Sequence, residues 1–227
     1  MNLVHMKITK AVHIEKEELN DDHYSSNPET PLRVDAFELE DDIKVELISR
    51  KFKDIMEILG LDLSDDSLKD TPNRVAKMYV KEIFSGLNPL NKPAVALFEN
   101  KYKYDEMILE KNITFYSNCE HHFVPIIGKA HVAYISNGKV IGLSKLNRIV
   151  DYFARRPQVQ ERLTVQIANE LKSILGTEDV AIVLDAKHLC VSMRGVKDEA
   201  SSTVTAHYSG KFKEEGVKNE FLAYIKD

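Results

Sequence analysis

The stretch that decides the fold is residues 130–184, AHVAYISNGKVIGLSKLNRIVDYFARRPQVQERLTVQIANELKSILGTEDVAIVL. It begins and ends with apolar runs rich in β-branched residues, which are typical of strands. With one earlier run, the candidate strands are residues 113–116, 130–135, 140–143 and 180–184. Before the last strand, four apolar residues recur at helical spacing, namely Leu163, Ile167, Leu171 and Ile174, and Gly176 is the expected end of this helix. This order predicts an α+β protein with helices layered on one face of an antiparallel sheet.

A smaller helical unit is predicted ahead of the sheet. Apolar residues recur at spacings of three and four from Val45 to Leu59, which favours one helix. A second helix is expected to have Thr71 as its N-cap and Pro72 at its first position. We therefore expect an N-terminal helical region over residues 37–92 and a sheet domain over residues 93–227.

The first residues of the chain are strongly acidic. Residues 15–42 hold eleven Asp and Glu against two basic residues, while the 227-residue chain as a whole has a net charge of −5. The polar, turn-rich composition of this segment predicts an acidic, disordered arm over residues 1–36. We expect removal of the arm to leave activity nearly unchanged. The nearly neutral remainder does not fit a general nucleic-acid binder.

The sequence also favours a protein of the cytoplasm. No apolar run approaches the roughly 20 residues that span a bilayer, and residues 1–14 do not resemble a secretory signal. We therefore expect no membrane partner. The two cysteines are expected to be reduced, as ligands, nucleophile or buried thiols.

Both cysteines lie next to histidines, in CEHH at 119–122 and in HLC at 188–190. Thiolate and imidazole are preferred zinc ligands, and the spacing of Cys119 and His122 lets one turn of chain aim both at a single ion. Cys190 is the candidate for a third ligand. Three protein ligands leave a position for water, whose pKa zinc lowers to about 7. The pattern predicts a catalytic zinc site.

Two other interpretations of the same residues stay open. The cysteines can be small buried hydrophobes, with the histidines as polar residues at strand ends. A closed structural zinc site is also compatible with the sequence, and it would need a fourth ligand. The candidates for that ligand are His121, His131, His188 and His207.

A cluster of cations indicates an anion site. The segment SKLNR at 144–148 begins a predicted helix, where Ser144 can cap and Lys145 and Arg148 lie nearly on one face. A helix N-terminus with a hydroxyl and two cations favours a polyanion. Arg194 adds a cation four residues after Cys190. Any one of these cations alone is more simply explained as part of a solvated surface, and Glu161 as a first-turn partner of its helix dipole.

Taken together, several segments resemble the GTP cyclohydrolase I family: NCEHHFVP at 118–125, GLSKLNR at 142–148, RPQVQERL at 156–163, HLCVSMRG at 188–195, and TPNRV at 71–75. The resemblance implies the tunnelling fold, or T-fold, and a homodecamer of two stacked pentamers with sites between subunits. It also implies hydrolysis of GTP at purine C8 with release of formate. An Amadori rearrangement and ring closure would then give 7,8-dihydroneopterin triphosphate. The whole reaction would be the first step of tetrahydrofolate and pterin biosynthesis.

The resemblance also implies a role for each site residue. The zinc (Zn²⁺) ligands would be Cys119, His122 and Cys190. The acid and base would be His121 and His188. Glu161, with Gln160 beside it, would bind guanine, and the triphosphate would be bound by Ser144, Lys145, Arg148 and Arg194.

Three alternatives to this interpretation stay open. A non-catalytic pterin- or nucleotide-binding module of the same fold would keep Glu161 but does not need the three metal ligands together. A T-fold nitrile reductase would use a nucleophilic cysteine and a nicotinamide cofactor, whereas both cysteines here are assigned to the metal. A structural protein with an incidental zinc leaves the cation set unexplained.

Overall fold

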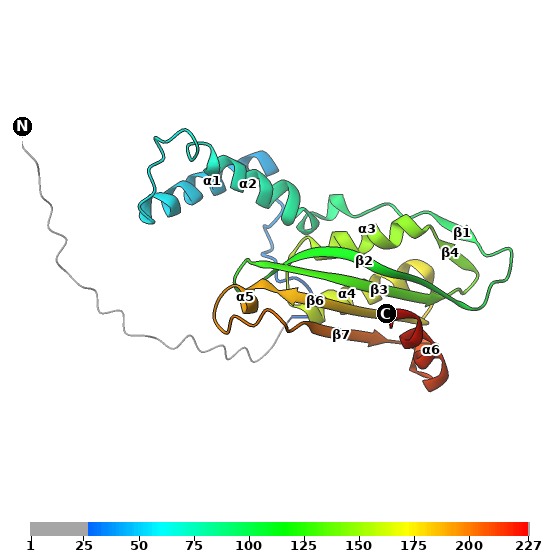
Figure 1. Cartoon of the computed structure of the whole chain (residues 1–227). Helices are drawn as coiled ribbons and strands as arrows, with labels where there is room; N and C mark the ends of the chain where they lie inside the picture. The colour runs from blue at the N-terminus through cyan, green and yellow to red at the C-terminus, as the bar shows by residue number, and fades with distance from the viewer. Residues whose placement is uncertain (1–26, 227) are drawn as a thin grey trace, which may run out of the picture.

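The computed structural model describes residues 27–226, so the disorder expected for residues 1–26 lies outside the described part. Two helices lie at one end of an elongated molecule, and a curled sheet with helices along it forms the rest (Figure 1). The longer helices are α1 Asp41–Ile58, α2 Thr71–Met78, α3 Leu143–Ala154, α4 Gln160–Leu175 and α6 Glu215–Ile225, with one short turn, α5 Leu189–Ser192. Among the described residues, no helix is long and apolar enough to cross a membrane.

The main sheet has the strand order β5-β2-β3-β6-β7. Its strands are β2 Met107–Cys119, β3 Pro125–Ile135, β5 Pro157–Gln158, β6 Val180–His188 and β7 Thr203–Tyr208. All neighbours are antiparallel except β5, which pairs with β2 in parallel. A separate pair joins β1 Leu97–Glu99 to β4 Lys139–Ile141. The α+β class and the antiparallel character of the sheet are confirmed.

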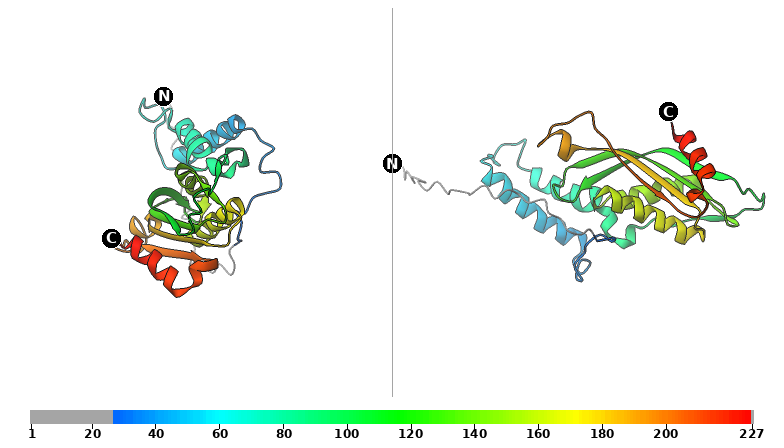
Figure 2. Two further views of the ribbon diagram at one scale, coloured as in Figure 1. Left: turned by 90° about the vertical axis from the view of Figure 1, so that its right-hand side faces the viewer. Right: turned by 90° about the horizontal axis from the view of Figure 1, so that it is seen from below.

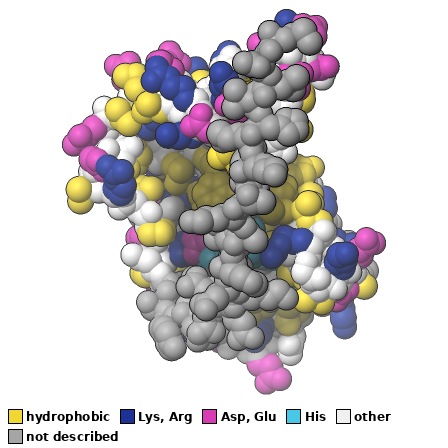
Figure 3. All heavy atoms as spheres, turned by 90° about the vertical axis from the view of Figure 1, so that its left-hand side faces the viewer, with side chains coloured by type: hydrophobic (Ala, Val, Ile, Leu, Met, Phe, Trp, Pro, Cys, Tyr) yellow, Lys and Arg dark blue, Asp and Glu magenta, His cyan; other side chains and the backbone are white. Residues whose placement is uncertain are grey.

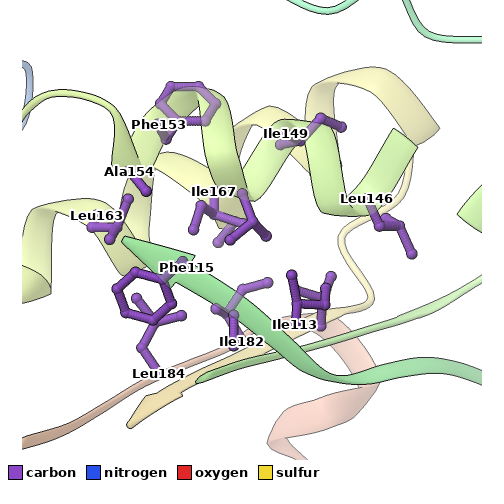
Figure 4. Packing of buried hydrophobic residues seen from close by; sticks show 14 of the residues in the cluster. Ile113, Phe115, Leu146, Ile149, Phe153, Ala154, Leu163, Ile167, Ile182 and Leu184 are labelled. Carbon is purple, nitrogen blue, oxygen red and sulfur yellow. The ribbon is translucent and has the colours of Figure 1, made fainter. Parts of the chain in front are cut away.

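The main core lies between one face of the sheet and α3 and α4. Side chains from β2 and β6 point toward side chains from the two helices (Figure 4). Its labelled members are Ile113, Phe115, Ile182 and Leu184 from the strands and Leu146, Ile149, Phe153, Ala154, Leu163 and Ile167 from the helices. Each fully buried aliphatic side chain of this kind contributes about 1.5 to 3 kcal/mol. The helical spacing that predicted α4 therefore marks its buried face.

A second core on the opposite face was not predicted. The C-terminal helix α6 lies against the far side of the sheet from α3 and α4 (Figure 2). Phe212 and Phe221 pack there with residues of β3 and β6, among them Ala133 and Val183. The apolar run of β6 is buried without alternation from Val180 to Leu184. Such a run is typical of a strand that is covered on both faces.

The expected helix ends are correct in one case and wrong in two. Gly176 ends α4 in the left-handed conformation at φ 64°, as predicted. Thr71 is not an N-cap but the first residue of α2, because the carbonyl of Asp70 already accepts the first helical hydrogen bond, from Arg74 N–H. Ser144 is not a cap either: Lys145 N–H bonds the carbonyl of Gly142, which starts α3 one residue earlier.

The helical unit is only partly covered. Val45 and Met56 of α1 are buried, but Ile55 is 49% and Leu59 71% exposed, although both belong to the predicted apolar face. After α2 the chain continues as one π-helical turn, Tyr79–Ile83, and two 3₁₀ turns, Ser85–Leu87 and Pro89–Asn91. Much of the apolar surface of α1 is thus available to another protein surface.

Gly86 joins the helical unit to the sheet domain. Its N–H donates to the carbonyl of Arg155 at 3.0 Å, and its own carbonyl accepts from Arg156 Nε at 2.8 Å. A Cβ at this position would lie 2.0 Å from the Tyr152 carbonyl oxygen. The close approach of two backbones at this point therefore requires glycine.

We expect Gly86→Ala to lower the free energy of unfolding by about 1 to 3 kcal/mol, the usual cost of overpacking. Thermal unfolding measures the effect. Gly216→Ala in α6 is the matched control, because a Cβ there meets nothing within 4 Å, and its melting temperature should stay level or rise. Equal melting temperatures for the two variants would contradict the prediction.

Candidate metal and nucleotide site

Three potential metal ligands meet at one end of the sheet. Cys119 ends β2, and Cys190 lies in α5, directly after β6. The ligand atoms of Cys119, His122 and Cys190 all lie within 4.8 Å of one another. The three-membered group agrees with the predicted open site, because among the described residues no fourth histidine, cysteine or carboxylate joins it.

A tight turn brings His122 back toward Cys119. Phe123 N–H donates to the carbonyl of Cys119 at 2.8 Å, and Cys119 N–H donates to the carbonyl of Val124 at 2.9 Å. Phe123 has the left-handed φ of 55° that this reversal requires, and its ring packs on Phe84 of the helical unit at 5.1 Å. As a result, His122 Nδ1 lies 3.8 Å from Cys119 Sγ.

The donor set suits zinc. Two sulfurs and one imidazole are ligands that zinc takes in tetrahedral geometry. Burial and the neighbouring Cys119 thiol raise the pKa of Cys190, with Arg194 opposing weakly. A divalent cation held by these residues would remove this penalty, because it would stabilise both thiolates. The Cys119, His122 and Cys190 group therefore fits a zinc ion.

His188 is held by a buried amide. His188 Nε2 lies 2.7 Å from Oε1 of Gln160, whose Nε2 donates to the carbonyls of Leu184 and Thr203. Backbone carbonyls only accept, so the amide nitrogen faces them and Oε1 faces the imidazole. His188 Nε2 therefore carries a hydrogen, which leaves Nδ1 as the ring atom able to exchange a proton with a ligand.

The surroundings of His188 favour its neutral form. Burial lowers its pKa, and the Glu161 carboxylate partly opposes this. The side chain of Gln160 is itself buried and engaged within the protein. The substrate contact expected of Gln160 stays a prediction; in the structure its side chain orients His188.

A cavity of about 720 Å³ lies beside the metal group. Glu161, at the first turn of α4, lines it together with His121 and Glu120. Its volume is in the range of small-molecule sites. In the face seen in Figure 3, histidine side chains lie in a hollow below apolar side chains, with Lys and Arg side chains nearby. Glu161, the guanine-binding candidate, and His121, one of the two acid or base candidates, thus share one cavity, whereas His188 is not among its lining residues.

A buried ion pair that the sequence did not predict supports this cavity. Arg162, 5% exposed, binds both carboxylate oxygens of Glu120. Glu120 Oε1 also lies 3.8 Å from His121 Nε2. The sequence holds one signal for this ion pair. Arg162 directly precedes the buried Leu163 on α4, and a buried guanidinium requires a partner.

The expected triphosphate residues do not all meet the metal group. Arg194 does, since its guanidinium donates to His122 Nε2 at 2.9 Å. Ser144 and Lys145 instead lie toward the other end of the sheet. They follow Ile141, whose N–H donates to the hydroxyl of Tyr134. Tyr134 pairs with Val180, and the nine residues of β6 separate Val180 from the metal end by about 25 Å.

Arg148 lies with Ser144 and Lys145 on the first half of α3, away from the metal group. One chain therefore brings together His121, His188, Glu161, Arg194 and the metal group. It does not bring Ser144, Lys145 and Arg148 to that place.

This combination of fold and site is that of a zinc-type hydrolase with a cavity for a small molecule. The family model of GTP cyclohydrolase I matches residues 48–226, and the chain belongs to this family. The chain is 63% identical over 210 residues to "GTP cyclohydrolase 1" of Flavobacterium johnsoniae, covering 92% of this chain and 94% of the relative. Proteins of the same name from Citrobacter koseri and Salmonella arizonae are 53% identical over 199 residues, covering 87% of this chain and 90% of each relative.

The geometry predicts which substitutions remove the metal. We expect the wild-type protein to bind about one zinc ion per chain. Cys190→Ser and His122→Ala should each lose most of this zinc, because only two of the three protein ligands would remain. Metal analysis of the purified variants measures this directly. His121→Ala is the control, since His121 lies 3.9 Å from Cys119 Sγ yet outside the ligand group. Zinc loss in His121→Ala equal to that in His122→Ala would show that the ligand set is misassigned.

Proposed function

We propose that this chain is a GTP cyclohydrolase I, which hydrolyses GTP at purine C8, releases formate and forms 7,8-dihydroneopterin triphosphate. The observation that carries the proposal is the Cys119, His122 and Cys190 group beside a cavity lined by Glu161 and His121. The 63% identity to a protein named GTP cyclohydrolase 1 supports the same activity. The reaction would be the first step of tetrahydrofolate and pterin biosynthesis.

The metal ligands and the substrate ligands have separate tasks. Cys119, His122 and Cys190 would hold zinc, which supplies a hydroxide-like nucleophile at neutral pH when bound. Glu161 would orient the base, because a carboxylate accepts hydrogen bonds from guanine N1–H and the 2-amino group together. Holding the substrate at both its base and its phosphates converts remote binding into orientation through several steps.

The two histidines would move protons. His188, whose Nε2–H is bonded to Gln160, presents Nδ1, which would take up the proton released by the attacking water and deliver it to purine N7 as the water adds at C8. His121 lines the cavity and would serve as acid and base in the later ring opening and closure. Arg162 neutralises Glu120 beside it, so that this carboxylate does not face the polyanionic substrate as an unpaired charge.

The triphosphate would be bound by two copies of the chain. Arg194 stands at the metal end, whereas Ser144, Lys145 and Arg148 lie at or toward the far end of the same sheet. A neighbouring subunit that presents its α3 to this cavity would complete the site. We therefore propose a homo-oligomer with shared sites, in the form of a homodecamer of two stacked pentamers. The exposed apolar residues of α1, including Ile43, Leu47 and Ile58, provide surface for such contacts.

The cytoplasm is the proposed compartment, because the ligand thiols must stay reduced to bind zinc. Measurement of formate released from GTP, alongside zinc content, tests the proposed reaction. A nitrile reductase would oxidise a nicotinamide without zinc, and a binding module would bind the nucleotide without releasing formate. Zinc-loaded protein that releases no formate from GTP would refute the proposed function.

Glu161→Gln is expected to weaken use of GTP and to lessen discrimination against ATP. Adenine offers an acceptor at N1 and no 2-amino donor, so ATP leaves the carboxylate unpaired. Sites of this kind discriminate by factors of roughly 10⁴. Values of kcat/KM for GTP, ITP and ATP on both proteins test the assignment, with Glu170→Gln on the same helix as control. An unchanged ratio of GTP to ATP would mean that Glu161 is only a first-turn helix residue.

Shared sites predict complementation between two defective variants. Lys145→Ala should lack phosphate binding and Cys190→Ser should lack the metal, so each homo-oligomer is expected to be nearly inactive. Oligomers reassembled from both chains should regain activity, because some sites pair an intact metal group with an intact α3. Two variants that both lack the metal, Cys119→Ser and Cys190→Ser, are the control and should not complement. Equal inactivity of the two mixtures would contradict the shared site.

A further inference from the structure

One wall of the cavity comes from a segment that precedes α1. Residues 30–32 line the same cavity as Glu161 and His121, yet the family model matches only from residue 48. We infer that this segment is a purine-binding element, in which the Thr30 hydroxyl hydrogen-bonds the base and the Leu32 side chain packs against it. The inference rests on the proposed function and adds binding residues to the same site.

The segment is anchored by buried groups rather than lying loosely on the surface. Arg162 Nε donates to the carbonyl of Asn27 at 2.7 Å, and Gln166 Nε2 lies 3.3 Å from Glu29 Oε2. The same guanidinium holds Glu120, the residue between Cys119 and His121. A single buried cation thus ties the segment to the turn that carries the metal ligands. The wall and the reacting end of the cavity are therefore held at a fixed spacing.

Thr30 carries a hydroxyl that the protein itself does not satisfy. Its Oγ1 is buried and has no hydrogen-bond partner among residues 27–226. Leaving an enclosed hydroxyl without a partner is unfavourable. Because Thr30 lines the cavity, rotation of its side chain would bring the hydroxyl to a purine bound there, and guanine retains an acceptor at O6 after Glu161 has taken its N–H groups.

Leu32 provides apolar surface for the flat face of the base. It is 46% exposed and also borders a second cavity of about 400 Å³, against Phe37, Ile48 and Tyr79 of the helical unit. An aliphatic side chain with a free face on a cavity gains stabilisation when a planar ring covers it. Leu32 thus separates the two cavities and limits the space that the base can occupy.

The decisive variant is Thr30→Val, which replaces only the hydroxyl by a methyl group. We expect KM for GTP to rise roughly 5- to 10-fold, the value of one hydrogen bond, with kcat within about 2-fold of wild type. The melting temperature should stay level or increase, because the hydroxyl has no partner to lose. A merely structural threonine would instead lower the melting temperature and leave KM unchanged.

Leu32→Ala should likewise raise KM. Removal of residues 1–36 should raise KM further, in contrast to the expectation that the first 36 residues are dispensable. Val34→Ala is the matched control, because Val34 is fully exposed and lines neither cavity. If wild type releases formate from GTP while Thr30→Val and Leu32→Ala keep the KM of Val34→Ala, this inference is wrong and the proposed function stands. A wild-type protein that releases no formate overturns both.

Discussion

The site depends on the register between β3 and its two neighbours. Asn118 of β2 pairs with Pro125, and Ile126 of β3 pairs with His188 of β6, so the ends of β2 and β6 lie level across one intervening strand. A slip of one residue would shift a strand end by about 3.3 Å and turn its side chains to the opposite face. The sulfur atoms of Cys119 and Cys190 would then no longer face one ion. The two cores that cover both faces of β3 and β6 are what holds this register.

Local patterns in the sequence predicted what is decided locally. The face of α4, its end at Gly176 and the proximity of Cys119 to His122 each depend on a few consecutive residues, and the structure agrees with them. The starts of α2 and α3 were displaced by one or two residues, because backbone hydrogen bonds outweighed the preference of Thr71 and Ser144 for caps. Element ends are set by such small differences, which residue preferences alone do not resolve.

Features that join distant parts of the chain could not be predicted from such patterns. The strand β7 and helix α6 have weak patterns and are specified by packing on the second face of the sheet. The pairing of Arg162 with Glu120 requires α4 to lie beside the end of β2, which only the complete fold provides. Cys190 was assigned through its neighbours and a family resemblance, and the meeting of the two sulfurs depends on strand order.

The bond from Arg162 to Asn27 spans 135 positions of the chain, and this has a consequence for how the protein is made. Asn27 leaves the ribosome early, but its anchor is synthesised roughly 7 to 27 s later, at ordinary rates of translation. Contacts this distant in sequence form late in folding, because the intervening chain must first be ordered. The segment before α1 therefore docks only after the sheet and α4 exist. A nascent chain therefore acquires its complete cavity only at the end of folding. Partly folded intermediates, which lack that cavity, cannot bind substrate there.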